Sequence, residues 1–75
     1  MSIDFGALLT TEQKQNLLSQ RIQQFAAEGY QHTLNKQVAE AKADEALVVS
    51  SQQAIDTLSA AIEEYQAELD KLATE

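Results

Sequence analysis

Seventy-five residues leave room for one small domain, and a core of that size rarely supplies more than about 3–5 kcal/mol without a disulfide, a metal or a second chain. The absence of Cys excludes a disulfide and a thiolate metal site, and the formal net charge of −7 argues against binding nucleic acid through its phosphates. No apolar run approaches the ~18 residues of a membrane span, and residues 1–4 lack the basic and apolar segments of a signal peptide, so we expect neither membrane insertion nor secretion by such a peptide.

Residues 1–10 are expected to form a short apolar arm rather than a stable helix. Gly6 interrupts this segment, and its few apolar side chains do not make one face of a helix. The arm must therefore pack on something else, which makes Phe5 a candidate partner contact. The remaining residues, 11–75, are expected to form a single helical, coiled-coil domain.

A first helix is predicted to begin after Thr10. Thr10 and Gln13 have the spacing of a capping box, in which each side chain accepts a hydrogen bond from the other residue's backbone N–H. Apolar or small residues then follow at intervals of four, three and four, as on one face of a helix. They are Leu18, Ile22, Phe25 and Gly29. We expect this helix to span about 18 residues.

Gly29 is predicted to end that helix. At the position after the C-cap, Gly29 makes Phe25 and Tyr30 the pair whose apolar contact accompanies a Schellman motif. The apolar pattern after Gly29 also lies on the opposite helical face from the pattern before it, and a break would let both faces meet. Two alternatives stay open: a continuous helix that tolerates Gly29 at a cost of about 1 kcal/mol, and a break at residues 43–45, where Asp44 could cap a new helix.

A second, long helix is predicted from about residue 33 to residue 73. Apolar residues recur there every seven positions: Leu34, Ala41, Val48, Ile55, Ile62 and Leu69. From residue 48 onward a second apolar position completes a coiled-coil seam, the candidate partner interface of Val48, Ile55, Leu58, Ile62, Tyr65, Leu69 and Leu72. Small flanking residues leave open a parallel coil, a trimer, an antiparallel bundle or docking on a larger protein. A first helix of about 27 Å could not cover a partner of about 60 Å, so part of the seam is expected to meet another chain.

No residue pattern identifies a reaction. Glu28 and His32 have a spacing that puts two ligands on one helix face, but no third ligand is near. Glu63, Glu64 and Glu68 fall on the outer face of the predicted helix, where solvation is the ordinary reason for carboxylates. We therefore expect no catalytic residue, no cofactor and no metal, and a protein that is not an enzyme.

The negative charge is confined to the C-terminal part. Residues 1–42 hold four acids and four bases, whereas residues 43–75 hold eight acids and one base, Lys71. An acidic inhibitor that mimics nucleic acid is therefore an alternative function, and an assembly chaperone is another.

Residues 9–14, 21–22 and 26–31, followed by an Ala- and Glu-rich coil, resemble small helical proteins encoded among bacteriophage structural genes. This resemblance implies a virion-associated role, as a tail, fibre, baseplate or capsid accessory subunit or an assembly chaperone, located in the virion or the host cytoplasm. The predicted fold is all-α, a helical hairpin or an oligomeric coiled coil. The predicted partners are a second copy of the chain or a larger structural protein, not nucleic acid or membrane.

Overall fold

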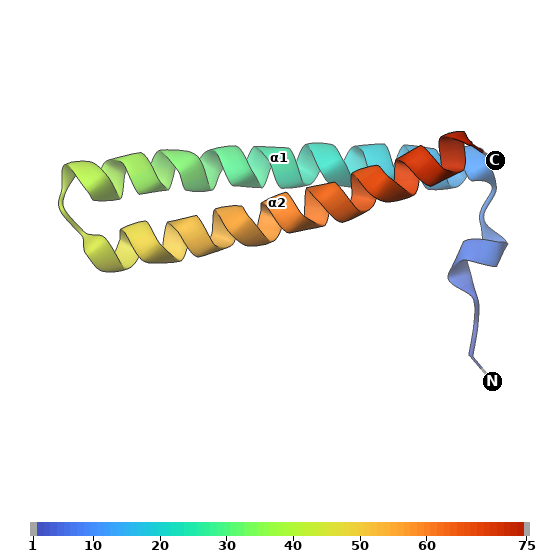
Figure 1. Ribbon diagram of the computed structural model, residues 1–75, viewed down its shortest axis with the longest axis horizontal. Coiled ribbons are helices and arrows are strands. Elements are labelled where there is room, and N and C mark those ends of the chain that lie inside the picture. The colour runs from blue at the N-terminus through green and yellow to red at the C-terminus, as the bar shows by residue number, and fades with distance from the viewer. Residues whose placement is uncertain (1, 75) are drawn as a thin grey trace.

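The computed structural model describes residues 2–74, which form a helical hairpin with a short arm at its N-terminal end (Figure 1). A 3₁₀-helix, η1 (Phe5–Leu8), precedes two long helices, α1 (Thr11–Ala41) and α2 (Glu45–Ala73). The two long helices run antiparallel and pack against each other, as the all-α prediction requires. The Cα atoms extend over 49 × 28 × 15 Å, and the two long helices of the described chain have only each other to pack against. Each helix therefore has one face against its neighbour and one face turned outward.

The start of α1 confirms the capping box. The backbone N–H of Gln13 donates to Thr10 Oγ1 at 3.1 Å, and the backbone N–H of Thr10 donates to Gln13 Oε1 at 2.9 Å. Glu12 places a carboxylate in the first turn, near the positive end of the helix dipole. Local sequence thus determines where the hairpin begins.

The predicted break at Gly29 is wrong. α1 continues through Gly29 for a total of 31 residues, and no glycine in the described chain has a positive φ. Tyr30 is 67% exposed, and Phe25 packs across the hairpin against Tyr65 instead of against Tyr30. Gly29 is an interior helical residue whose carbonyl accepts a hydrogen bond from Thr33 Oγ1 at 2.9 Å. The helix tolerates it because one interior glycine costs only about 1 kcal/mol.

The chain reverses at residues 43–45, the alternative break position, through a Schellman motif centred on Ala43. The N–H of Ala43 donates to the carbonyl of Glu40 at 3.1 Å, and the N–H of Asp44 donates to the carbonyl of Ala39 at 2.9 Å. Ala43 has a φ of 55°, the left-handed conformation that usually selects glycine. Asp44 Oδ1 then accepts the N–H of Leu47 at 3.2 Å and caps α2. The single helix predicted from residue 33 to residue 73 is therefore two helices.

The change of apolar face at Gly29 has a different cause from the one predicted. The half-buried and buried stripe of α1 keeps its spacing of three and four residues through Gly29, but small and polar side chains continue it. Its members are Leu18, Ile22, Phe25, Gly29, His32, Lys36 and Ala39. Leu34 and Ala41, assigned to the seam from sequence, lie on the exposed face of the same helix. One helix thus carries an inner stripe and a second, outward apolar stripe.

Candidate interaction surfaces

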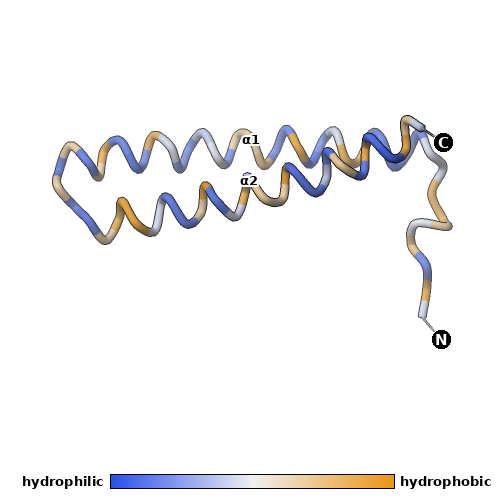
Figure 2. The backbone as a smooth tube through the Cα atoms, in the orientation of Figure 1, coloured by the Kyte–Doolittle hydropathy of each residue, from blue (hydrophilic) through white to orange (hydrophobic). Residues whose placement is uncertain are grey.

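The contact between α1 and α2 is a thin layer of half-buried side chains. The stripe on α2 consists of Val48, Ser51, Ile55, Leu58, Ile62, Tyr65, Leu69 and Leu72. Apolar residues recur along both helices in Figure 2. Among residues 2–74, the buried hydrophobic residues are Ala39 (0% exposed) and Leu72 (8%), and no large side chain is fully buried. Two helices alone cannot enclose these side chains, because each covers only one side of the other.

The predicted partner residues on α2 lie where α1 packs. The expectation of a second chain along this stripe followed from a first helix of about 18 residues, whereas α1 has 31 residues and α2 has 29. α1 is thus long enough to run beside the whole of α2. The proposal that this stripe also meets another chain stays a prediction. The surfaces that the hairpin leaves exposed are further candidates for contact with a partner.

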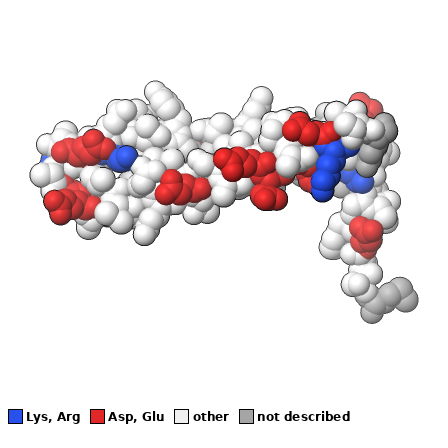
Figure 3. All heavy atoms as spheres, in the orientation of Figure 1, with Lys and Arg blue, Asp and Glu red and all other residues white. Residues whose placement is uncertain are grey.

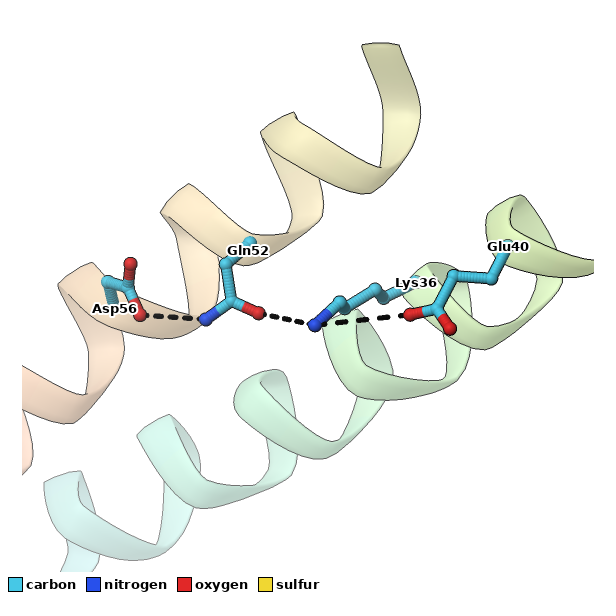
Figure 4. Close-up of polar contacts among 4 residues, drawn as sticks. All are labelled: Lys36, Glu40, Gln52 and Asp56. Atoms are coloured by element: carbon cyan, nitrogen blue, oxygen red, sulfur yellow. Dashed lines mark hydrogen bonds and ion pairs between the residues drawn. The ribbon is translucent and has the colours of Figure 1, made fainter. Parts of the chain in front are cut away.

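Near the reversal, polar side chains replace apolar ones between the helices (Figure 4). Lys36 Nζ donates to Gln52 Oε1 at 2.7 Å, and Gln52 Nε2 donates to Asp56 Oδ1 at 2.8 Å. Lys36 Nζ also lies 3.9 Å from Glu40 Oε1. This chain of contacts joins α1 to α2 and fixes their relative position where the stripe offers little apolar area. Hydropathy alone could not reveal it, because Lys36 and Gln52 are polar residues that are ordinarily expected to face solvent.

The N-terminal arm, defined here as residues 2–9, extends away from the end of the hairpin (Figure 1). Phe5, the predicted partner contact of this segment, is 73% exposed, and Ile3 and Leu8 are exposed to a similar degree. Where the arm joins the hairpin, a hollow of about 300 Å³ is lined by Gly6, Leu9, Lys14, Leu17, Leu18, Glu68, Lys71 and Leu72. The arm therefore offers apolar side chains that the hairpin itself does not cover.

A second exposed apolar surface runs along α1 opposite α2. Tyr30, Leu34 and Val38 are exposed and follow one another at intervals of four residues. Such spacing keeps side chains on one helical face. The sequence contained a sign of this surface, namely the shift of the apolar pattern after Gly29, but that shift was interpreted as a break.

Acidic side chains are spread along the face of the hairpin shown in Figure 3. Asp56, Glu63, Glu64 and Asp70 are exposed on α2, and Lys71 Nζ lies 4.0 Å from Glu68 Oε1. An exposed pair of this kind contributes about 0–1 kcal/mol. The outer face of α2 is therefore strongly negative.

Between Ser2 and Thr74, no group of three His, Cys, Asp or Glu side chains could hold a metal ion, and no helix is long and apolar enough to cross a membrane. Comparison with protein-family models, with curated proteins and with solved structures found no match for this chain. The functional proposal consequently rests on the exposed surfaces and the distribution of charge.

Proposed function

We propose that this chain is a non-enzymatic structural subunit that acts through protein–protein contact, either by self-association or by docking on a larger structural protein. One observation carries the proposal: more large apolar side chains of the described chain are exposed than buried. Scattered exposed apolar residues such as Leu17, Leu47 and Val49 are ordinary, but the others gather on the N-terminal arm and on one face of α1. Surfaces of this kind are typical of interaction sites.

The setting we propose is that of a bacteriophage virion accessory protein, part of a tail, fibre, baseplate or capsid, in the virion or the host cytoplasm. Two features support it beside the sequence resemblance. The hairpin is long and thin, with extents of 49 × 28 × 15 Å, and its apolar arm projects from one end. An assembly chaperone would also need exposed apolar side chains to contact its partner, and it is kept as the alternative within this setting.

The molecular mass in solution tests the proposal. Light scattering is measured on the purified chain alone and after mixing with the products of the genes that flank its own. We expect a mass above that of one chain in at least one of these samples, because burying the exposed apolar side chains lowers the free energy. A mass of one chain in every sample, up to millimolar concentration, would contradict the proposal.

A second candidate function is that of an acidic inhibitor that mimics nucleic acid. The observations that favour it are the formal charge of −7 carried by residues 43–75 and the exposure of all six acidic side chains of α2. The two functions respond differently to salt, since interactions between exposed charges are screened whereas apolar contacts are not. Binding to a basic protein that is lost as salt is raised would favour the mimic, and association that persists in high salt would favour the apolar surfaces.

A further inference from the structure

The outward stripe of α1 continues beyond its three large side chains as an uncharged surface. We define the outer α1 face as Ala27, Tyr30, Gln31, Leu34, Gln37, Val38 and Ala41. All seven residues are exposed, and at 100° per residue they lie on the side of α1 opposite Phe25, Gly29 and Lys36. The absence of charged residues from this face matches the depletion of charge at the core of protein interfaces.

The outer α1 face is nearly symmetric about Leu34. Three residues to either side of Leu34 stand Gln31 and Gln37, and four residues to either side stand Tyr30 and Val38. Ala27 and Ala41 lie seven residues away on the two sides. A two-fold axis that passes between two facing copies of Leu34, perpendicular to the helices, would place each of these residues opposite its counterpart in a second, antiparallel helix. The isologous contact of a two-fold dimer would then bring Tyr30 beside Val38 and Gln31 beside Gln37, apolar with apolar and amide with amide.

The distribution of charge selects the same face. Residues 43–75 hold eight acids and one base, whereas residues 11–42 hold three acids and four bases. Two copies that met through their α2 helices would bring like charges together, which opposes association. Two copies that meet through α1 keep both acidic helices on the outside, where water and counterions surround them.

We propose that a second copy of this chain docks antiparallel on the outer α1 face, with Leu34 of one copy against Leu34 of the other. This inference rests on the proposed function and names its partner. Tyr30 then packs beside Val38 of the second copy, and Gln31 and Gln37 border the apolar contact. Ala27 and Ala41 let the helices approach to the 8–10 Å that is usual for packed helices.

In the structure the chain's own N-terminal arm does not take this place, because it extends away from the end of the hairpin (Figure 1). Leu34 lies 23 residues along α1 from Thr11, which is about 35 Å at 1.5 Å per residue. The arm as the structure places it therefore leaves Leu34 exposed.

The proposed interface is short, and its affinity is correspondingly limited. The proposed contact, from Ala27 to Ala41, is about 21 Å long along the helix axis, which is shorter than α1 itself. Small interfaces of this kind give weak or transient association unless other contacts add to them. We expect a dimer that forms over the micromolar concentration range rather than a permanent one.

Cross-linking tests the position of the axis. The wild-type chain has no Cys, so each introduced Cys is unique. Leu34→Cys should oxidise to a disulfide-linked dimer, because the two Cα atoms lie within the ~7 Å that a disulfide requires. The matched control is Val49→Cys, at an exposed apolar position on α2. Equal rates of cross-linking for the two variants would overturn the inference.

The same approach tests the antiparallel orientation. A mixture of Tyr30→Cys and Val38→Cys chains should give mainly the mixed dimer, because these positions face each other across the proposed axis. In a parallel pair each variant would cross-link with itself instead, and that result would overturn the orientation proposed here.

Sedimentation measures the contribution of Leu34 to affinity. Leu34→Asp should raise the dissociation constant by about tenfold or more, since it removes the central contact and adds two facing charges. Leu34→Gln should act in the same direction more weakly, and Val49→Asp should change little. Circular dichroism checks that each variant keeps its helices, which is expected because residues 34 and 49 are exposed.

The outcomes separate this inference from the proposed function. If the wild-type chain associates and Leu34→Asp does not weaken it, whereas Phe5→Asp does, the arm is the contact and the inference fails while the proposed function stands. If the wild-type chain alone is a monomer up to millimolar concentration, the inference also fails. The proposed function then depends on the mixtures with flanking gene products described above.

Discussion

The ring of Phe25 in α1 meets the ring of Tyr65 in α2 edge-on, with 5.3 Å between centroids and an interplanar angle of 62°. Aromatic pairs prefer this geometry, because the positive edge of one ring faces the negative face of the other. Together with the hydrogen bond from Lys36 to Gln52, this pair fixes the register of the hairpin. The positions midway along the chain between the two partners are 45 and 44, which agrees with a reversal next to Asp44.

The coupling between these two rings should be measurable. We expect Phe25→Leu and Tyr65→Leu each to lower the free energy of unfolding, and their effects to be less than additive. The coupling should be about 0.5–1.5 kcal/mol, the value of an aromatic pair beyond its buried area. Urea unfolding of the four proteins at one fixed concentration gives this quantity, and a coupling near zero would show that the rings act independently.

Replacing Ala43 by glycine should stabilise the hairpin. Ala43 occupies the left-handed region at a φ of 55°, where an L-residue is strained and glycine is not. We expect Ala43→Gly to raise the free energy of unfolding by about 0.5–1 kcal/mol, and the β-branched Ala43→Val to lower it. Thermal or urea unfolding checks both. A destabilised Ala43→Gly protein would contradict the Schellman geometry at the reversal.

Replacing Gly29 by alanine should also stabilise the protein, which is the opposite of what a helix end at Gly29 would give. An added Cβ at Gly29 meets no atom within 4 Å, and the helix backbone around it is regular. We expect a gain of about 1 kcal/mol in the free energy of unfolding. Ala26→Gly, at an exposed position of the same helix, is the control and should cost a similar amount. Loss of stability in Gly29→Ala would show a close approach of α2 at this position.

Gly29 and Ala43 show how far the sequence alone could predict the fold. The all-α class, the capping box at Thr10 and Gln13, and the cap at Asp44 depend on local hydrogen bonding and could be identified. The reversal was assigned to Gly29 because glycine commonly occupies the left-handed cap, whereas the chain places Ala43 there. The strain at Ala43 is small enough for a complete Schellman motif and the Asp44 cap to offset it, and nothing in the sequence displays that balance.

The sequence predicted one of the two exposed apolar surfaces, the N-terminal arm, and assigned the other, on α1, to the wrong face. Phe5 on the arm was selected because apolar residues outside any helical pattern lack an obvious neighbour, and it is exposed. Leu34 was assigned to the inner seam because a repeat of seven residues happens to connect it to Val48 across the reversal. The inner stripe at Gly29, His32 and Lys36 is too polar to be recognised by hydropathy, so the outward stripe was mistaken for it.

Substitutions on the inner and outer faces of α2 should differ sharply. Ile62 is half-buried on the stripe that packs against α1, and Glu63 is exposed. Ile62→Asp should place an unpaired carboxylate between the helices and lower stability by a few kcal/mol, enough to unfold so thin a hairpin. Glu63→Ala should change stability by less than about 0.5 kcal/mol.

Circular dichroism and sedimentation of the two proteins decide what the α2 stripe does. If Ile62→Asp loses its helices together with its assembly, the stripe holds the hairpin itself together. If Ile62→Asp stays helical and loses assembly alone, the stripe faces a second chain. If Ile62→Asp is tolerated while Glu63→Ala and Glu64→Ala abolish binding to a basic partner, the acidic-mimic function is favoured.

Salt should strengthen self-association of the wild-type chain. Each copy carries a formal charge of −7, located in residues 43–75, and docking through the outer α1 face brings two such charge distributions within the length of one hairpin. The screening length falls from about 30 Å at 0.01 M salt to about 8 Å at 0.15 M, so most of this repulsion is removed over that range. We expect the association constant, measured by sedimentation equilibrium, to rise severalfold between these salt concentrations and to change little above them. An association constant that falls as salt is added would instead show that opposite charges hold the copies together, and the uncharged face around Leu34 would then not be the contact.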